Sequence, residues 1–497
     1  MIADLQFQSL YRPGAEIAAR GRRLAGGLAA LGLREGDVLA ALLRNDPVFA
    51  DIIEACRIAG IHYCALNWHF TPAELDFILR DSGAKALIGH ADLLDAARAA
   101  WPQGVPVLAV DGAPQDARDY ETWLARQPDY AGPLVPPRGA MGYTSGTTGR
   151  PKGVRRLPVP LDRLAAQQAR MRELVAQTLG IVPGCRALVS APLYHSAPGA
   201  FAAQALAQAE LVMLAPRFDA EETLALIARH RITAAYLVPT MYVRMLRLPE
   251  EVRRRHDLSS LGFVASSGAP CAPEVKRAMI AWFGPVITET YGSTETGMVT
   301  VATSADCLAK PGTAGRPVEG AEIRILDAAG RRCPPGVAGT VYVRQPAYPD
   351  FTYHNQDAAR RAIERDGFVT LGDIGYLDAE GYLFLCDRAA DMVVSGGVNI
   401  YPAEIEHALL ALPEVLDCAV FGVPDAEFGE RLHAVVQPAP GAAPVAAALC
   451  AALRGRIAGY KVPRSIEFTA ALPRDPNGKI AKRRLREGYW QGQARRI

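Results

Sequence analysis

Several common sequence features are missing from this 497-residue chain. It has no run of about 18 apolar residues, the length that crosses a bilayer as a helix. Its nine cysteines form no CxxC pair and its nine histidines no HExxH, which argues against a disulfide framework and a zinc site. The N-terminus lacks the basic and apolar regions of a secretory signal. We therefore expect a soluble, cytoplasmic protein.

A strong excess of one charge is also missing. Lysine and arginine number 54 against 52 aspartates and glutamates, a formal net charge of +2. This balance gives no reason to expect a nucleic-acid partner. Half of the residues are hydrophobic and 21% are charged, as in an ordinary globular protein. The length exceeds a single hydrophobic core and suggests two to four structural units.

Between about residues 37 and 300, short apolar runs alternate with amphipathic helical patterns. Thr71-Pro-Ala-Glu74 predicts a helix start, because it combines a capping box with proline at the first helical position. Asp219 predicts a second start, for a helix that runs to His230. Repetition of strand and helix predicts a largely parallel α/β sheet with buried strands. We expect its strands at residues 39–43, 85–89, 211–214, 235–238 and 263–266.

The pattern changes in the last third of the chain. Alternating runs at 322–326, 340–343 and 381–385, separated by glycine and proline turns, predict a small β-rich subdomain over about residues 316–387. A helical pattern at 402–412 and strand patterns at 419–421 and 433–436 predict a small α+β unit beyond it. The expected division is an N-terminal domain of residues 1–387 and a small mobile C-terminal lid of residues 388–497.

The most informative segment is Tyr143-Thr-Ser-Gly-Thr-Thr-Gly-Arg-Pro-Lys-Gly153. Short hydroxyl side chains donate hydrogen bonds to phosphate oxygens, and glycines let backbone N–H groups approach an anion. Lys152 adds a positive charge. The segment is not a Walker A loop, because Pro151 replaces the second glycine and Gly153 the Ser/Thr of that motif. It predicts a phosphate-binding loop, and a flexible linker is the alternative interpretation.

This loop and seven later segments resemble, in order, the motifs of the AMP-forming adenylate enzymes. That family includes acyl-CoA synthetases, nonribosomal-peptide adenylation domains and firefly luciferase. The match covers about residues 140–480, while earlier residues match only in general pattern. The seven segments are Pro192-Leu-Tyr-His195, Thr290-Tyr-Gly-Ser-Thr-Glu295, Thr370-Leu-Gly-Asp373, Asp387-Arg388, Ser395-Gly-Gly397, Tyr401-Pro-Ala-Glu404 and Pro476-Asn-Gly-Lys479.

The resemblance implies a reaction in two steps. A carboxylate attacks the α-phosphate of ATP to give acyl-AMP and pyrophosphate, and a thiol, usually coenzyme A, then displaces AMP. The acid is already ionised at neutral pH, so the first step needs charge neutralisation and in-line positioning rather than a base. ATP, Mg²⁺ and coenzyme A are therefore the expected small molecules. A homodimer is left open.

The resemblance also assigns residues to the nucleotide. It places Glu295 on Mg²⁺, together with Thr147, and Asp373 on both ribose hydroxyls, with Arg388 reaching ribose or phosphate. A cradle for the β- and γ-phosphates is implied at Thr144, Ser145, Gly146, Thr147, Thr148, Gly149 and Lys152. The adenine is expected beside Gly268, Ala269, Pro270, Thr290, Tyr291, Gly292, Ser293 and Thr294.

Three assignments concern the lid. Lys479, after the turn signal Asn-Gly, is implied to reach the substrate carboxylate and the α-phosphate during adenylation only. Gly396 and Gly397 leave a narrow passage for pantetheine as the lid turns between the steps. The family usually has Asp or Lys at the hinge, whereas this chain has Ala390. Alanine can absorb a change in φ and ψ, but lid kinetics are then expected to differ.

His195 matches the aromatic gate next to the acyl carbonyl. Amino-acid-activating relatives carry an aspartate there for the substrate ammonium, so histidine argues against an amino acid. Residues 236–240 and 266–269 add no charge, which favours a fatty, aromatic or alicyclic acid. The leading interpretation is an acyl-CoA synthetase. The alternatives are an acyl-AMP ligase that loads a carrier protein, a luciferase-like enzyme and a non-catalytic nucleotide-binding relative.

Overall fold

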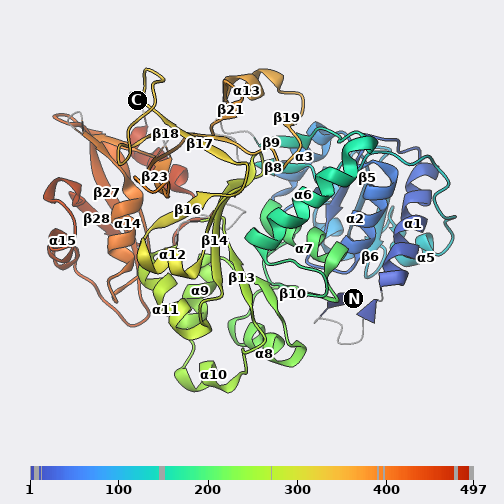
Figure 1. The fold of residues 1–497 in the computed structure, drawn as a ribbon, viewed down its shortest axis with the longest axis horizontal. Coiled ribbons are helices and arrows are strands. Elements are labelled where there is room, and N and C mark those ends of the chain that lie inside the picture. Colours follow the sequence, from blue (N-terminus) through green and yellow to red (C-terminus); the bar gives the residue numbers. More distant parts are fainter. Residues whose placement is uncertain are drawn as a thin grey trace.

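The computed structural model describes residues 2–4, 11–12, 14–144, 151–269, 271–388, 391–395, 398–474 and 480–491. Figure 1 shows the chain as a row of sheets and helices, with the N-terminal part at one end and the C-terminal part at the other. No helix of the described residues is both long enough and apolar enough to cross a membrane.

The first sheet is parallel and contains five strands. Its order is β4 (His62–Ala65), β3 (Val38–Leu42), β5 (Ala84–His90), β6 (Val107–Val110) and β7 (Arg118–Asp119). Every residue of β3 is buried, as expected for a strand covered on both faces. The helices that precede and connect these strands are α1 (Gly14–Ala30), α2 (Val48–Ala59) and α3 (Pro72–Ser82).

Both predicted helix starts are confirmed. The Thr71 side chain accepts a hydrogen bond from the Glu74 N–H, and the Glu74 carboxylate in turn accepts from the Thr71 N–H at 2.8 Å. The Asp219 side chain accepts from the Glu222 N–H at 2.9 Å and starts α8 (Ala220–His230). These caps satisfy backbone donors that have no partner inside the helix.

The second sheet contains 15 strands and passes from parallel to antiparallel pairing. Its central parallel strands, in spatial order, are β11 (Leu211–Leu214), β10 (Arg186–Val189), β12 (Ala234–Tyr236), β13 (Phe263–Ser266) and β14 (Ile287–Ser293). The strand expected over 235–238 ends at Tyr236 instead. Pro239 starts α9 (Pro239–Leu246), since proline has no N–H for a strand ladder but fits the first helical turn.

The antiparallel part continues the same sheet and so is not detached from it. β15 (Gly297–Ala302) pairs with β14 and with β16 (Thr313–Pro317), and β16 pairs with β23 (Leu383–Arg388). The β-rich region is joined through β22 (Asp373–Leu377), β18 (Gly339–Arg344) and β17 (Glu322–Leu326). The three sequence patterns predicted for it therefore form strands.

A third, three-stranded sheet flanks the glycine- and hydroxyl-rich segment. It consists of β8 (Gly142–Thr144), β9 (Lys152–Arg156) and β19 (Phe351–Tyr353). One buried apolar cluster joins the first two sheets, with Leu39 of β3, Leu188 of β10 and Phe201 of α7 (Ser196–Gln208) among its members. The long helix α6 (Leu161–Leu179) and the helices α11 (Pro273–Phe283) and α12 (Ser304–Ala309) complete this part.

The C-terminal part, orange to red in Figure 1, has its own sheet and its own apolar core. The long hairpin of β26 (Val415–Asp425) and β27 (Gly429–Pro438) extends well beyond the short strands expected at 419–421 and 433–436. The other strands are β24 (Val393–Ser395), β25 (Val398–Ile400) and β28 (Ser465–Phe468). Helices α14 (Pro402–Leu410), α15 (Ala446–Arg454) and α16 (Lys482–Glu487) make this part α+β, as predicted.

Candidate active site

The predicted phosphate-binding loop connects two paired strands. Thr144 of β8 lies opposite Lys152 of β9, and the residues between them at 145–150 lie outside the described part of the chain. The Lys152 side chain is buried, and its Nζ stands 5.0 Å from the centre of the Tyr353 ring. The two flanking side chains predicted for the phosphate site thus lie opposite each other at the ends of two paired strands.

Glu295 reaches this hairpin from a distant part of the sequence. Its carboxylate Oε1 accepts a hydrogen bond from the Tyr353 hydroxyl at 3.0 Å and a longer one from Thr144 Oγ1 at 3.4 Å. Glu295 is only 5% exposed. Burial of Tyr353, with the Glu295 charge beside it, raises the pKa of the phenol, which therefore stays a donor. The second carboxylate oxygen makes no hydrogen bond to the described residues, so it is available to a cation.

Two residues of this cluster had no sequence signal. Tyr353 contacts both Lys152 and Glu295, but the motif positions do not include it. Arg156 donates to the backbone oxygens of Thr294 (2.8 Å) and Pro349 (2.9 Å) and so joins β9 to the turn that carries Glu295. Its neighbour in sequence is another arginine, and such a pair is typical of a solvated basic surface. Both residues are identified by their tertiary contacts and not by their spacing in the sequence.

The predicted ribose residues form a second cluster. Asp373 at the start of β22 lies opposite Arg388 at the end of β23. The Tyr291 hydroxyl donates to Asp373 Oδ2 at 2.7 Å, and Arg388 Nε lies 3.4 Å from Asp373 Oδ1. Burial, followed by the Asp373 charge, raises the pKa of Tyr291. Tyr291 therefore orients the carboxylate through its hydroxyl, a role additional to the place beside adenine expected for its ring.

The expected adenine platform is partly visible. Gly268 and Ala269 are exposed just after β13, and Gly268 has a φ of +89° with open space where a Cβ would be. Gly292, Ser293 and Thr294 follow Tyr291 on the same strand and turn. Thr290 differs from them: it is 4% exposed, and its hydroxyl lies 3.3 Å from the Met298 sulfur. The same hydroxyl lies 3.5 Å from the Ser266 oxygen at the end of β13, so Thr290 is packed between neighbouring strands of the sheet.

His195 lies at the entry of α7, beside the turn that carries Glu295. Its backbone is extended and its ring is 4.5 Å from that of Tyr194, measured between centroids. The next residue, Ser196, accepts a hydrogen bond from Thr294 Oγ1 at 2.8 Å. Tyr236, at the end of β12, is fully buried and shares a 2.7 Å hydrogen bond with Ser267. The segments expected for the acyl group therefore carry rings and hydroxyls, and the hydroxyls of Tyr236 and Ser267 are bonded to each other.

Nine predicted site residues and the hinge position Ala390 lie outside the described residues. The nine are Ser145, Gly146, Thr147, Thr148, Gly149, Pro270, Gly396, Gly397 and Lys479. Their assignments stay predictions.

A separate cluster of Asp46, His90 and Asp111 lies at the carboxyl ends of the first sheet and has the spacing of a metal site. The Arg44 N–H donates to His90 Nδ1 at 3.2 Å, so Nδ1 is an acceptor. The neutral imidazole then carries its proton on Nε2, the nitrogen that faces Asp46 at 3.4 Å and Asp111 at 3.9 Å. A metal-binding histidine needs that nitrogen bare. The hydrogen bonding thus disfavours a cation here.

Comparison with known proteins gives the family. The AMP-binding enzyme family matches residues 14–348, and the AMP-binding enzyme C-terminal domain matches residues 404–479. A feruloyl-CoA synthase of Amycolatopsis sp. is 36% identical over 480 residues, which cover 96% of this chain and 93% of that protein. A fatty acid–[acyl-carrier-protein] ligase of Streptomyces coeruleorubidus is 31% identical over 504 residues, covering 99% and 93%.

Solved structures agree with this result. The amide bond synthetase of Marinactinospora thermotolerans superposes with a TM-score of 0.85 at 27% identity, covering 98% of this chain and 96% of that one. The o-succinylbenzoate CoA synthetase of Bacillus subtilis, in complex with its acyl-adenylate intermediate, gives 0.80 at 29% identity, covering 95% and 92%. The clusters around Glu295 and Asp373 thus lie in a chain that belongs to the AMP-binding enzyme family.

Proposed function

We propose that this protein is an AMP-forming acid–thiol ligase. It uses ATP and Mg²⁺ to adenylate an organic carboxylic acid and then transfers the acyl group to coenzyme A, releasing AMP and pyrophosphate. The observation that carries the proposal is that one strand, β14, connects the cluster around Asp373 with the cluster around Glu295. β14 bears Tyr291, which contacts the ribose-type cluster at Asp373, and leads directly into Glu295 of the phosphate-type cluster.

The residues around Glu295 fit a magnesium ion. Mg²⁺ prefers one or two protein oxygens together with phosphates and waters, and Glu295 offers one carboxylate oxygen that the described residues leave free. Bound there, the ion would neutralise phosphate charge. Tyr353 and Thr144 hold the other oxygen and so orient the carboxylate. Lys152 supplies a fixed positive charge for the departing pyrophosphate.

The first step needs alignment more than proton transfer. The substrate carboxylate oxygen forms a bond to the α-phosphorus while the bond to the β-phosphate oxygen breaks, and pyrophosphate leaves. Asp373, held by Tyr291 and Arg388, accepts from the ribose hydroxyls and fixes the nucleotide along β14. Lys479 would bridge the carboxylate and the α-phosphate in this step.

The second step uses the C-terminal part. The thiol sulfur forms a bond to the acyl carbon, the carbon–oxygen bond to AMP breaks, and the thiol proton goes to solvent. We place the boundary of the moving part after Asp387, so residues 388–497 would turn as a lid and bring the passage at Gly396 and Gly397 to the adenylate. The separate apolar core of this part supports such a unit.

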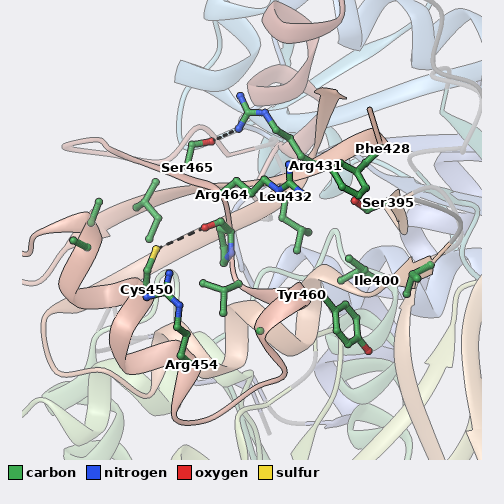
Figure 2. Close-up of a pocket in the computed structure, with 17 residues that line it drawn as sticks. Ser395, Ile400, Phe428, Arg431, Leu432, Cys450, Arg454, Tyr460, Arg464 and Ser465 are labelled. Atoms are coloured by element: carbon green, nitrogen blue, oxygen red, sulfur yellow. Dashed lines mark hydrogen bonds between the residues drawn. The ribbon is translucent and has the colours of Figure 1, made fainter. Parts of the chain in front are cut away.

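A cavity of about 860 Å³ on the C-terminal part supports coenzyme A as the acceptor. Figure 2 shows three arginines on its walls, from β27, α15 and the entry of β28: Arg431, Arg454 and Arg464. Arg464 also stacks 4.3 Å from the Phe428 ring centre, and Tyr460 is 60% exposed. Guanidinium groups bind phosphates, and exposed rings stack on a base. The same cavity includes Ser395 and Val398, which flank the predicted pantetheine passage.

The acceptor is tested with Arg454→Gln. We expect a rise of about tenfold or more in the KM for coenzyme A, because one charge-assisted contact to phosphate is worth roughly 1.5–3 kcal/mol. Pyrophosphate release from acid and ATP should not change. Arg456→Gln, an exposed arginine two residues further on, is the matched control. An unchanged KM for coenzyme A in Arg454→Gln would contradict the binding of coenzyme A in this cavity.

For the acid, we propose an uncharged aromatic tail. Tyr236, Ser267 and His195 supply rings and hydroxyls without a fixed charge. The similar feruloyl-CoA synthase carries the name of an aromatic acid, which supports this class. A pyrophosphate-release screen over aromatic, short, long and alicyclic acids tests it, with acyl-CoA identified by mass. A kcat/KM that is highest for a fatty acid would contradict the aromatic class. If no acid caused pyrophosphate release, the proposal of a ligase would itself be overturned.

A carrier-protein ligase is the second candidate, because one relative that matches 99% of the chain carries that name. Parallel reactions with free coenzyme A and with a phosphopantetheinylated carrier protein separate the two. Faster loading of the carrier would favour the second candidate.

A further inference from the structure

A second cavity, of about 330 Å³, lies against β9 and the end of β19. Basic and amide side chains dominate its walls. They come from the first sheet, the segment before β8, β9 and the residues after β19, and include His62, Arg138, Arg155, His354 and Asn355. The resemblance to known motifs assigns none of these residues a role.

Strand alternation places part of this cavity behind the phosphate site. Lys152 and Arg155 are three residues apart on β9, so their side chains point to opposite faces of the three-stranded sheet. Thr352 of β19 pairs directly with Arg155 and shares its face. Lys152 contacts Tyr353 on the side of Glu295. The wall formed by Arg155 and Thr352 is therefore the reverse face of the strand that holds the catalytic lysine.

Three of the five N–H groups of Arg155 are in use. Its guanidinium donates to His62 Nε2 at 3.3 Å, to His354 Nδ1 at 3.1 Å and to the Gly36 oxygen at 2.9 Å. Arginine can only donate, so both imidazole nitrogens are acceptors and both rings are neutral. Arg155 therefore brings to the cavity its positive charge and two N–H groups that have no acceptor among the described residues.

Arg138 also has N–H groups without an acceptor. One of its nitrogens donates to Glu35, but its Nε is buried and has no hydrogen-bond partner among the described residues. A buried donor without an acceptor costs roughly 1–3 kcal/mol. The Asn355 side chain is exposed and also makes no hydrogen bond to described residues. His62 Nδ1 is likewise buried without a hydrogen-bond partner among the described residues, and it carries the ring proton because Nε2 accepts from Arg155. Donors without acceptors thus gather on this wall.

On the cavity walls themselves, arginines outnumber carboxylates, because Asp357 is the single carboxylate among the described lining residues. Outside the walls, Glu35 pairs with Arg138 and Asp37 lies near Arg155. Arg156 turns to the other face of β9, where Glu295 and Asp350 lie near it. Asp357 already accepts from the Thr352 hydroxyl at 3.1 Å. Burial and the neighbouring Arg138 lower the pKa of Arg155, and burial with both arginines lowers the pKa of His62 to about 3. The positive groups thus repel one another, and a bound anion would relieve the repulsion.

We propose that this cavity binds a phosphate-type oxyanion. The Arg138 guanidinium, the remaining N–H groups of Arg155 and the Asn355 amide donate to its oxygens, and the two arginines supply the surrounding positive potential. The oxyanion comes either from free inorganic phosphate or from the pyrophosphate that the proposed reaction releases. The site itself does not depend on the ligase proposal.

The test is an NMR titration of the full-length protein, labelled in its histidine rings, with inorganic phosphate at constant ionic strength set by chloride. The His354 resonance, assigned with His354→Gln, should shift and saturate. Arg138→Gln should weaken this response at least tenfold. Arg118→Gln, an exposed arginine on β7 of the first sheet, is the matched control and should leave it unchanged. Lys152→Met removes the catalytic phosphate contact and should also leave it unchanged.

Asn355→Asp provides a second variant that does not threaten folding, because the residue is exposed and aspartate tolerates its φ of +55°. It replaces a donor by a negative charge and should also weaken the response. No saturable shift of His354, or equal loss in Arg118→Gln and Arg138→Gln, would overturn the site. Tighter binding of pyrophosphate than of phosphate would identify the reaction product as the source, and equal binding would identify free phosphate.

Discussion

At the scale of single residues, the functional side chains of this protein depend on partners that are distant in sequence. Glu295 is oriented by Tyr353 and Thr144, and Asp373 is oriented by Tyr291. Each carboxylate accepts from a hydroxyl whose own pKa stays high because it is buried beside a negative charge. The partner, as much as the carboxylate, therefore decides how the carboxylate oxygens are oriented.

Tyr353→Phe tests this dependence. Removal of the hydroxyl leaves Glu295 free to rotate, and a hydrogen bond to a charged group is worth roughly 1.5–3 kcal/mol. We expect kcat/KM for Mg·ATP to fall about tenfold or more, with little change in melting temperature. Tyr376→Phe is the control, because Tyr376 stacks on Phe384 at 5.0 Å in the neighbouring antiparallel region. Equal kinetics in Tyr353→Phe and wild type would contradict the assignment.

A buried ion pair joins α11 to β14, the strand that bears Tyr291. Lys276 of α11 and Glu289 of β14 are 3% and 9% exposed, and Nζ lies 2.6 Å from Oε2. Lys276→Met leaves Glu289 buried without its partner, which should cost about 3–5 kcal/mol and lower the melting temperature strongly. The double variant Lys276→Met/Glu289→Gln should recover most of that loss. A double variant as unstable as the single one would show that packing, not charge, is the cause.

At the scale of elements, β9 is the strand on which the site depends. Its two faces carry Lys152 and Arg155, and Arg156 anchors its end to the turn of Glu295. Arg155 joins it to the first sheet by donating to His62 and to the Gly36 oxygen. This connection requires His62 to be neutral, because a protonated imidazole cannot accept.

The connection predicts acid sensitivity. The pKa of His62 is about 3 in the folded protein and about 6.5 when unfolded, mainly because burial disfavours its charge. Between these values the unfolded chain binds a proton that the folded one does not, so stability is lost as pH falls. From pH 8 to pH 5.5 the His62 contribution should fall by about 1.4 kcal/mol.

Thermal unfolding at the two pH values measures this loss. His62→Gln, which keeps an oxygen acceptor for Arg155, should lose less melting temperature on acidification than the wild type. His256→Gln, just after α10 (Glu250–Arg255), is the control and should behave as the wild type. The same drop in all three proteins would assign the acid sensitivity to other groups.

At the scale of the whole molecule, the proposed function requires two arrangements of the C-terminal part. Lys479→Ala should reduce adenylation from acid and ATP by several orders of magnitude, because the bridging charge is lost. Thioester formation from supplied acyl-AMP and coenzyme A should stay within a few-fold of wild type. Arg483→Ala on α16 is the matched control. Equal loss of both half-reactions would contradict a lysine that acts in one step only.

Sequence reasoning found much of the fold. Residues 322–326 and 402–410 have the predicted strand and helix, and Thr71 and Asp219 cap helices as expected. These signals are local: caps, turns and periodic burial act over a few residues. Errors arose where tertiary contacts decide, as in the long hairpin of β26 and β27, whose pairing extends past the apolar runs.

For the site, the sequence by itself determined which chemical groups are present and in what order: hydroxyls and glycines before Lys152, a carboxylate at Glu295, another at Asp373. Only the tertiary structure decided which of them meet. Tyr353 reaches Glu295 across 58 residues and Tyr291 reaches Asp373 across 82, separations at which no local pattern survives. Tyr353 lies on β19 of the three-stranded sheet and Glu295 in the turn after β14, while Tyr291 and Asp373 lie on β14 and β22, which are not neighbours in the second sheet. Contacts of this kind depend on how sheets and turns pack in the whole chain and not on distance along it.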